Sequence, residues 1–199
     1  MIRPILRGKD IKRYSYVDSG KYLINTHNGI KEKGIPPIDI LDYPAIKNHL
    51  DSFGDVLVRR SDQGDTPYNL RNCAYLEDFS KPKIIFQEMV QESQFYYDSS
   101  AEFFCNDTCR IITGEYLPYL LLILNSHLFF YSVKHFYGGG GLGGHGVRMK
   151  HTFFQRFPCL PYDEKIELSI GSNDSQYFEK LLCQRYDLND EEIQHILND

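Results

Sequence analysis

A long apolar stretch in the second half of this 199-residue chain constrains the fold more than any other feature. It runs from Leu117 to Val133. Four residues interrupt it: Pro118, Asn125, Ser126 and His127. The stretch is marginally short for a membrane span, and Pro118 falls in the first turn of a helix, where a missing N–H is tolerated. It therefore predicts one long buried helix over about residues 115–136.

Short runs of strand-forming residues predict a sheet beside this helix. The 15 Tyr and 13 Phe favour an α+β or mainly β domain over a helical bundle. Strands are predicted over residues 22–26, 83–89, 94–97 and 109–113, and the last three are spaced as in a meander. Apolar residues recur every three or four positions between 43 and 60, which predicts an amphipathic helix unless Gly54 breaks it.

The C-terminal segment predicts two further helices, over residues 174–186 and 189–197, the second capped by Asn189. We therefore expect an α+β fold, in which a twisted, mostly antiparallel sheet packs with a long buried helix and a helical C-terminal tail. Residues 1–161 would form one domain, with residues 162–199 as an acidic helical tail packed on it.

Charge is distributed unevenly along the chain. The net charge is −5, but residues 151–199 hold 4 Lys or Arg against 10 Asp or Glu, which leaves residues 1–150 at +1. Between Glu115 and Asp163 there is no acidic residue. A local positive face is compatible with these numbers, and nucleic-acid binding depends on that face more than on the total. A solvated loop with scattered charge is the alternative.

Cysteine usage and the N-terminus indicate the compartment. Five cysteines without a C-x-x-C pair predict reduced, mostly buried thiols in a soluble cytoplasmic protein. We expect no signal peptide, because no apolar run follows the basic first residues. The glycine-rich segment over residues 138–146 follows a helix rather than a strand, so it does not indicate a nucleotide site.

Four phrases along the chain share one chemistry, in which cationic or amide side chains stand beside aromatic and strand-forming residues. They are L-R-G-K-D-I-K-R-Y (6–14), P-Y-N-L-R-N-C-A-Y (67–75), K-P-K-I-I-F-Q-E (81–88) and L-N-S (124–126). None carries a catalytic signature. This chemistry is typical of a surface that binds a polyanion while the reaction is carried out elsewhere.

In this order the phrases resemble the TaqI-like C-terminal specificity domain, the target recognition domain of adenine-specific DNA methyltransferases and single-chain restriction-modification enzymes. The likeness runs from about Arg3 to Pro161, and Y-D-L-N-D-E-E-I (186–193) is similar to the short acidic helix that often closes such enzymes. The resemblance implies sequence-specific recognition of double-stranded DNA. An adenine methyltransferase catalytic domain, in the same or a partner chain, would flip the adenine and transfer methyl from S-adenosylmethionine.

The catalytic half of such an enzyme has no counterpart in this sequence. The Asn-Pro-Pro-aromatic tetrapeptide is missing, and Ile35-Pro36-Pro37-Ile38 does not match it. We therefore expect this chain alone to be no enzyme and to hold no cofactor, with S-adenosylmethionine bound by the catalytic domain. Met1 lies almost on the first phrase, which suggests an excised fragment or a separate specificity subunit.

The candidate DNA contacts divide by chemistry. Arginine fits guanine edges and Asn or Gln fits adenine edges, so the base-edge candidates are Arg59, Gln63, Asn69, Arg71 and Arg148. The same cluster adds Arg60, Thr66 and Tyr68. The phosphate-binding candidates are Lys9, Lys12, Lys134, His145 and Lys150. The resemblance favours Arg59, Tyr68 and Arg71. Alternatively, Arg59 and Arg60 pair with Asp55 or Asp62 as ordinary surface ion pairs.

Two other classes of function are weighed against DNA recognition. A magnesium-dependent nuclease would need a lysine two residues after an acid such as Glu88, but Met89 and Val90 follow instead. We therefore expect Glu88 to be a solvated residue after a core strand, and no metal site. A protein-interaction module would dock a partner through the acidic tail and the apolar helix.

Overall fold

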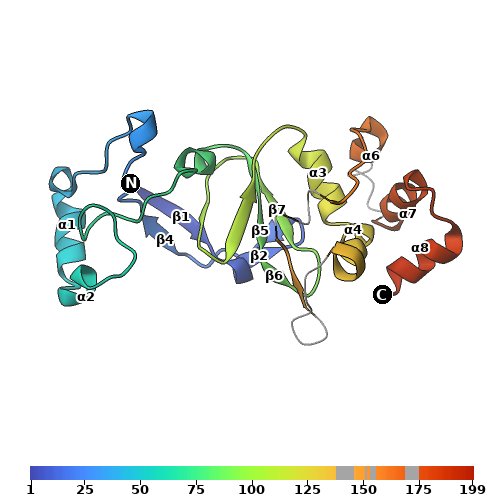
Figure 1. Ribbon diagram of the computed structural model, residues 1–199, viewed down its shortest axis with the longest axis horizontal. Coiled ribbons are helices and arrows are strands. Elements are labelled where there is room, and N and C mark those ends of the chain that lie inside the picture. The colour runs from blue at the N-terminus through green and yellow to red at the C-terminus, as the bar shows by residue number, and fades with distance from the viewer. Residues whose placement is uncertain (138–145, 151, 153–155, 169–174) are drawn as a thin grey trace.

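The computed structural model describes residues 1–137, 146–150, 152, 156–168 and 175–199. The molecule is elongated (Figure 1). Two short helices, α1 (Pro44–Asp51) and α2 (Asp55–Val58), form one end, small β-sheets lie in the middle, and the C-terminal helices form the other end. The predicted α+β class is confirmed. Among the described residues, no helix is long and apolar enough to cross a membrane.

The central sheet contains three antiparallel strands in the order β7-β5-β9. They are β5 (Lys83–Gln87), β7 (Phe95–Asp98) and β9 (Cys109–Ile112). Strand β5 lies in the middle because Ile84, Ile85 and Phe86 are all buried, and such a run needs cover on both faces. The predicted meander order is therefore wrong. Between β7 and β9 the chain forms β8 (Phe104–Cys105), which joins a different sheet.

Three smaller sheets surround this one. Strand β1 (Ile2–Leu6) pairs antiparallel with β4 (Tyr22–Ile24) and parallel with β8. The other pairs are β2 (Ile11–Lys12) with β3 (Ser15–Tyr16), and β6 (Met89–Val90) with β10 (Val147–Arg148). Among the described residues, four short 3-10 helices lie between these elements: η1 (Gly8–Asp10), η2 (Lys31–Lys33), η3 (Ile40–Asp42) and η4 (Leu76–Ser80).

The predicted long helix over residues 115–136 is wrong, because the apolar stretch forms three segments. They are α3 (Leu117–Leu124), α4 (His127–Ser132) and the π-helical turn η5 (Val133–Tyr137). At the break, the Asn125 amide accepts the Phe95 N–H at 3.0 Å and donates to the Phe95 carbonyl at 2.9 Å. Ser126 caps α4 by accepting the Phe129 N–H at 3.0 Å. Polar side chains that bind backbone groups in this way end helices.

This geometry also changes the interpretation of two of the four phrases. Asn125 and Ser126 are buried, and so is Lys83 of the K-P-K-I-I-F-Q-E phrase. Their polar groups therefore stabilise the interior and do not belong to a surface that binds a polyanion.

The predicted amphipathic helix over residues 43–60 is divided at Gly54, whose φ of 52° is a backbone conformation that favours glycine. No residue of α1 or α2 is buried. Of the apolar residues at the predicted spacing, Ile46, Leu50 and Leu57 are half-buried, and Ala45 and Phe53 are exposed. The predicted apolar face is therefore only partly covered.

The hydrophobic core lies on both faces of β5. Ile84 and Phe86 pack in the larger cluster, whereas Ile85 packs with Leu6 and Ile11 in the smaller one. Three C-terminal helices contribute to the larger cluster: α6 (Glu164–Leu168), α7 (Ser175–Arg185) and α8 (Asp190–Leu197). Asn189 caps α8, as predicted, by accepting two backbone N–H groups at 3.0 Å.

Candidate nucleic-acid interface

Seven of the candidate residues lie between Arg59 and Arg71, in the loop that follows α2. The loop is attached to the end of β4, because the Leu70 N–H donates to the Thr26 carbonyl at 2.8 Å and the Thr26 hydroxyl donates to the Tyr68 carbonyl at 2.7 Å. A bridge between Gln63 and Leu70 closes it. The loop therefore has a defined shape before any partner binds.

Asn69 stands inside this loop, with only 2% of its surface exposed. Its side-chain oxygen accepts the Thr66 hydroxyl at 2.6 Å, and its amide donates to the Ile38 carbonyl at 2.9 Å. Both ends of the side chain are thus occupied by protein groups. The structure places Asn69 and Thr66 in the internal framework of the loop.

Arg60 and Gln63 also bind the loop backbone. The Arg60 guanidinium donates to the carbonyls of Asn69 at 2.6 Å and Pro67 at 3.2 Å. The Gln63 amide donates to the carbonyl of Arg60 at 2.9 Å. These two side chains therefore hold the turn together. The sequence also allowed Arg60 to pair with Asp55 or Asp62, but among the described residues its guanidinium binds backbone carbonyls instead.

We predict that Asn69→Ala lowers the free energy of unfolding by about 1–2 kcal/mol, because it removes a buried amide and leaves the carbonyl of half-buried Ile38 without this donor. Urea denaturation measures the change. The exposed neighbour Asn72 is the control, and Asn72→Ala should have a smaller effect. An Asn69→Ala protein as stable as the parent would contradict the framework role.

Arg59 and Arg71 are the guanidinium groups that the loop presents to solvent. The Arg59 side chain is 80% exposed and 3.1 Å from Asp55, and the Arg71 side chain is 71% exposed and 3.4 Å from Asp62. Exposed pairs of this kind contribute little to stability. Either arginine can therefore exchange its carboxylate for a phosphate or a base edge at small cost.

Tyr68 connects the loop to α1. Its hydroxyl donates to Asp51 at 2.6 Å, and the Lys47 ammonium lies 5.5 Å from the ring centroid. Hydrogen bonds from Lys47 and Tyr68 lower the pKa of Asp51. The Tyr68 ring is thus fixed in place, with a cation on one face.

A second cluster centres on Glu88, immediately after β5. Arg148 donates to this carboxylate at 2.7 Å and Arg110 of β9 donates to it at 2.5 Å. The hydrogen bond from Arg148, with the charges of Arg110 and Lys150, lowers the pKa of Glu88. The expectation of a solvated Glu88 is wrong, since only 16% of its side chain is exposed. Glu88 instead holds two arginines in fixed positions.

Sequence reasoning did not select Arg110, because no motif surrounds it. The pairing of β9 with β5, which sets Arg110 opposite Phe86, brings it to Glu88, and this register is not visible in the sequence. Three glutamines that were also not selected, Gln87, Gln91 and Gln94, line an open hollow beside β6. Their amides are the type of group that binds adenine edges.

A cleft of about 550 Å³ joins the two clusters, because Arg71 of the loop and Arg110 of β9 both line it. Asn25 also lines this cleft, and its side-chain oxygen is buried without a hydrogen-bond partner among the described residues. The loop, the cleft and the Glu88 cluster thus form one continuous surface, to which Arg71, Arg110 and Arg148 contribute exposed guanidinium groups.

The remaining candidates lie in several places. Lys9 of η1, Lys12 of β2 and Lys150 after β10 are exposed. Lys134 of η5 pairs with the C-terminal residue Asp199 at 2.5 Å. His145 lies outside the described residues. Among the residues that the structure describes, no group of three or more His, Cys, Asp or Glu side chains is arranged to hold a metal ion.

Exposed guanidinium groups along a loop and a cleft are the chemistry expected of a surface that binds a polyanion. The family comparison agrees, since the family model of the TaqI-like C-terminal specificity domain matches residues 3–141. The chain belongs to this family. Membership associates it with DNA sequence recognition in restriction-modification methyltransferases. No curated protein matches the chain.

Proposed function

We propose that this chain is the sequence-specific, double-stranded DNA recognition module of an N6-adenine methyltransferase or combined restriction-modification enzyme. The observation that carries the proposal is the surface of Arg71, Arg110 and Arg148, in a chain of the specificity-domain family. A catalytic domain in the same or a partner chain would bind S-adenosylmethionine and act on the flipped adenine in the cytoplasm. This chain would supply neither cofactor nor catalytic residues.

Within this function the candidate residues have two roles. Arg59, Arg71, Arg110 and Arg148 would contact base edges or phosphates, and Lys9, Lys12 and Lys150 would contact phosphates. Arg60, Gln63, Thr66 and Asn69 would act indirectly, by holding the loop in its binding shape. A loop ordered before binding loses less conformational entropy when it meets DNA.

Arg71→Ala tests the base-contacting role. If Arg71 makes a bidentate base contact, we expect the change to weaken binding by about 1–3 kcal/mol and relax the preference at one base pair. Titration of a cognate duplex and its single-base variants measures both effects. Arg185→Ala is the control, because Arg185 of α7 pairs with Asp163, just before α6. Unchanged affinity and preference would remove Arg71 from the interface.

Lys150→Ala tests the phosphate-contacting role. We expect weaker binding to all duplexes alike, because phosphates carry no sequence information. The slope of log K against log salt should fall by about 1, since one fewer counterion is released. Titrations at several salt concentrations measure the slope. A loss confined to the cognate sequence would contradict this role.

A further inference from the structure

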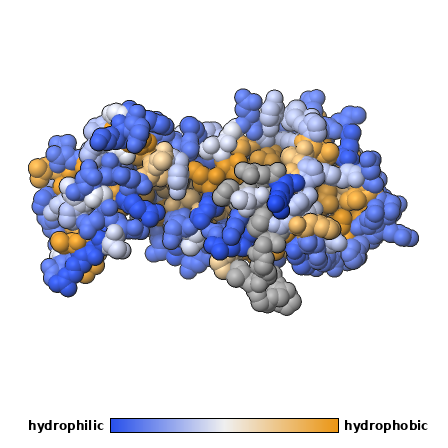
Figure 2. Space-filling view, viewed as in Figure 1, coloured by the Kyte–Doolittle hydropathy of each residue, from blue (hydrophilic) through white to orange (hydrophobic). Residues whose placement is uncertain are grey.

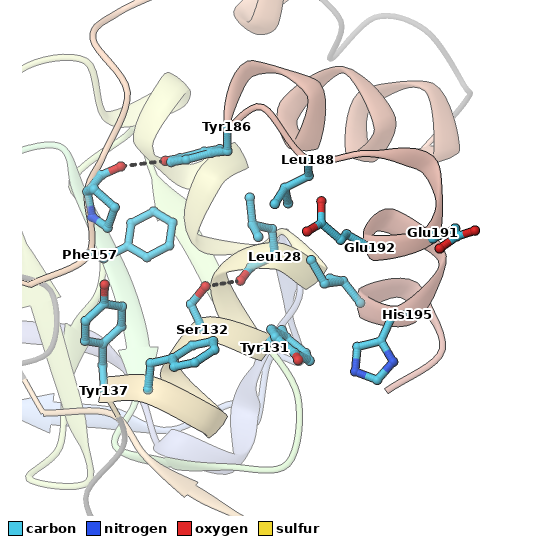
Figure 3. Close-up of a pocket in the computed structure, with 13 residues that line it drawn as sticks. Leu128, Tyr131, Ser132, Tyr137, Phe157, Tyr186, Leu188, Glu191, Glu192 and His195 are labelled. Carbon is cyan, nitrogen blue, oxygen red and sulfur yellow. Dashed lines mark hydrogen bonds between the residues drawn. The ribbon is translucent and has the colours of Figure 1, made fainter.

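The C-terminal end of the molecule contains a cleft that the proposed DNA interface does not use. Its volume is about 610 Å³, in the range of ligand sites. Figure 3 shows it between α4 with η5 on one side and the turn from α7 to α8 on the other. Five aromatic side chains line it: Tyr131, Phe136, Tyr137, Phe157 and Tyr186. Figure 2 shows hydrophobic side chains exposed over this end of the molecule.

Two of the hydroxyl groups in this lining are bound to backbone carbonyls. Tyr186 donates its hydroxyl to the Pro158 carbonyl at 2.8 Å, and Ser132 donates to the Leu128 carbonyl at 2.8 Å. A bound ligand would therefore contact mainly aromatic rings and aliphatic groups, because the Tyr186 and Ser132 hydroxyl protons are already donated to carbonyls.

Three titratable side chains of α8 also belong to the lining: Glu191, Glu192 and His195, whose ring lies 5.8 Å from that of Tyr131. Figure 3 shows the Glu192 carboxylate beside Leu188, on the cleft side of α8. One of its oxygens accepts the Asn189 N–H at 2.8 Å, which leaves further lone pairs available. Within the part of the chain that the structure describes, neither glutamate forms a salt bridge. The cleft therefore offers negative charge without a cationic partner.

The surrounding charge has the same sign. Residues 162–199 hold 3 Lys or Arg against 10 Asp or Glu. A polyanion is repelled by such a region, whereas a cation is attracted. A cation held over aromatic faces gains from the ring quadrupoles, and a carboxylate beside it adds a charge-assisted hydrogen bond. The planar guanidinium of arginine suits both contacts better than the ammonium of lysine.

We propose that this cleft docks an arginine-bearing apolar segment of a partner polypeptide. Apolar side chains of the segment would pack on Leu128, Leu188 and Ile196, and its guanidinium would lie among the rings near Glu192. The basis is charge complementarity and the aromatic lining, so this site is independent of DNA binding.

A pair of short peptides tests the proposal on the whole chain. The chain contains no tryptophan, so the fluorescence of a tryptophan-bearing peptide reports on the peptide alone. The probe is acetyl-Leu-Trp-Arg-Leu-amide, and its neutral counterpart carries citrulline, which has nearly the shape of arginine without the charge. We expect the arginine peptide to bind about tenfold more tightly, from the cation–π and carboxylate contacts.

Glu192→Gln removes the charge at the cleft and keeps the helix cap, because glutamine also serves at this position of a capping box. We expect it to abolish most of the preference for arginine over citrulline. Glu164→Gln, an exposed acid of α6, makes the same charge change elsewhere and should keep the preference. Phe136→Ala, at a 69% exposed ring whose loss should not unfold the chain, should weaken both peptides.

Three results would overturn the proposal. The first is equal affinity for the two peptides, and the second is no binding of the arginine peptide at concentrations up to about 1 mM. The third is a preference for arginine over citrulline that is as large in the Glu192→Gln protein as in the Glu164→Gln protein. Each is independent of whether the chain binds DNA.

Discussion

Lys83→Met is expected to lower the free energy of unfolding by about 3–5 kcal/mol, because it removes one partner of a fully buried ion pair. The side chains of Lys83 and Asp98 are both 0% exposed, and their charged groups lie 2.6 Å apart. Asp98 also accepts the Phe103 N–H at 3.0 Å, and Lys83 also donates to the Phe79 carbonyl at 2.9 Å. Methionine keeps most of the apolar length of lysine, so the lost charge dominates the effect.

Urea denaturation measures this loss, and a neighbouring lysine supplies the control. Lys81 belongs to the same phrase but pairs with Asp78 at the surface, so Lys81→Met should change stability little. Adding Asp98→Asn to Lys83→Met should recover part of the loss, because the uncompensated carboxylate is then neutral. Equal effects of Lys83→Met and Lys81→Met would contradict the buried pair.

Glu179→Ala is expected to lower the free energy of unfolding by about 3 kcal/mol, since charge-assisted hydrogen bonds are lost and a backbone donor stays unpaired. Glu179 of α7 is 2% exposed. Its carboxylate accepts the His127 N–H at 3.1 Å, contacts the His127 ring at 2.9 Å and lies 3.3 Å from Arg13. It therefore connects a C-terminal helix to the start of α4 and to the first phrase.

The same denaturation experiment checks this connection. Lys180→Ala is the control on the same helix, because Lys180 pairs with Asp190 at the surface. Glu179→Gln should lose less than Glu179→Ala, since one acceptor oxygen remains. If Glu179→Ala is no more damaging than Lys180→Ala, α7 does not contribute to stability through this carboxylate.

The buried pair of Lys83 and Asp98 shows what the sequence alone does not predict. The apolar run Ile84 to Phe86 predicted a core strand, and the structure confirms it, since burial of both faces follows from the residues themselves. That Lys83 would be buried with them depends on Asp98, which only the pairing of β5 with β7 brings opposite it. Long-range pairing of this kind is not encoded in local periodicity.

The helix break has a similar cause. Hydrophobic periodicity predicted one helix, because Asn125 and Ser126 interrupt an apolar run only briefly. The break depends on hydrogen bonds from Asn125 to Phe95, 30 residues earlier in the chain. By contrast, the Asn189 cap was predicted correctly, because its partners are two and three residues away.

For the candidate interface, the residue types did not reveal which side chains face solvent and which hold the loop together. The sequence selected the loop as a whole, but it did not separate Arg71, which is exposed, from Asn69, which is buried. It selected Arg148 and did not select Arg110, although both bind Glu88. Whether an amide or guanidinium faces solvent is decided by backbone carbonyls that the fold brings near.

Selection from a randomised duplex library at near-physiological salt tests the central claim most directly. The retained duplexes are sequenced and compared with the input pool, and the selection is repeated with Arg71→Ala. A sequence-reading surface predicts enrichment of one short motif, with the preference at one of its base pairs relaxed in the variant. Retention of no duplex even at low salt would contradict the account.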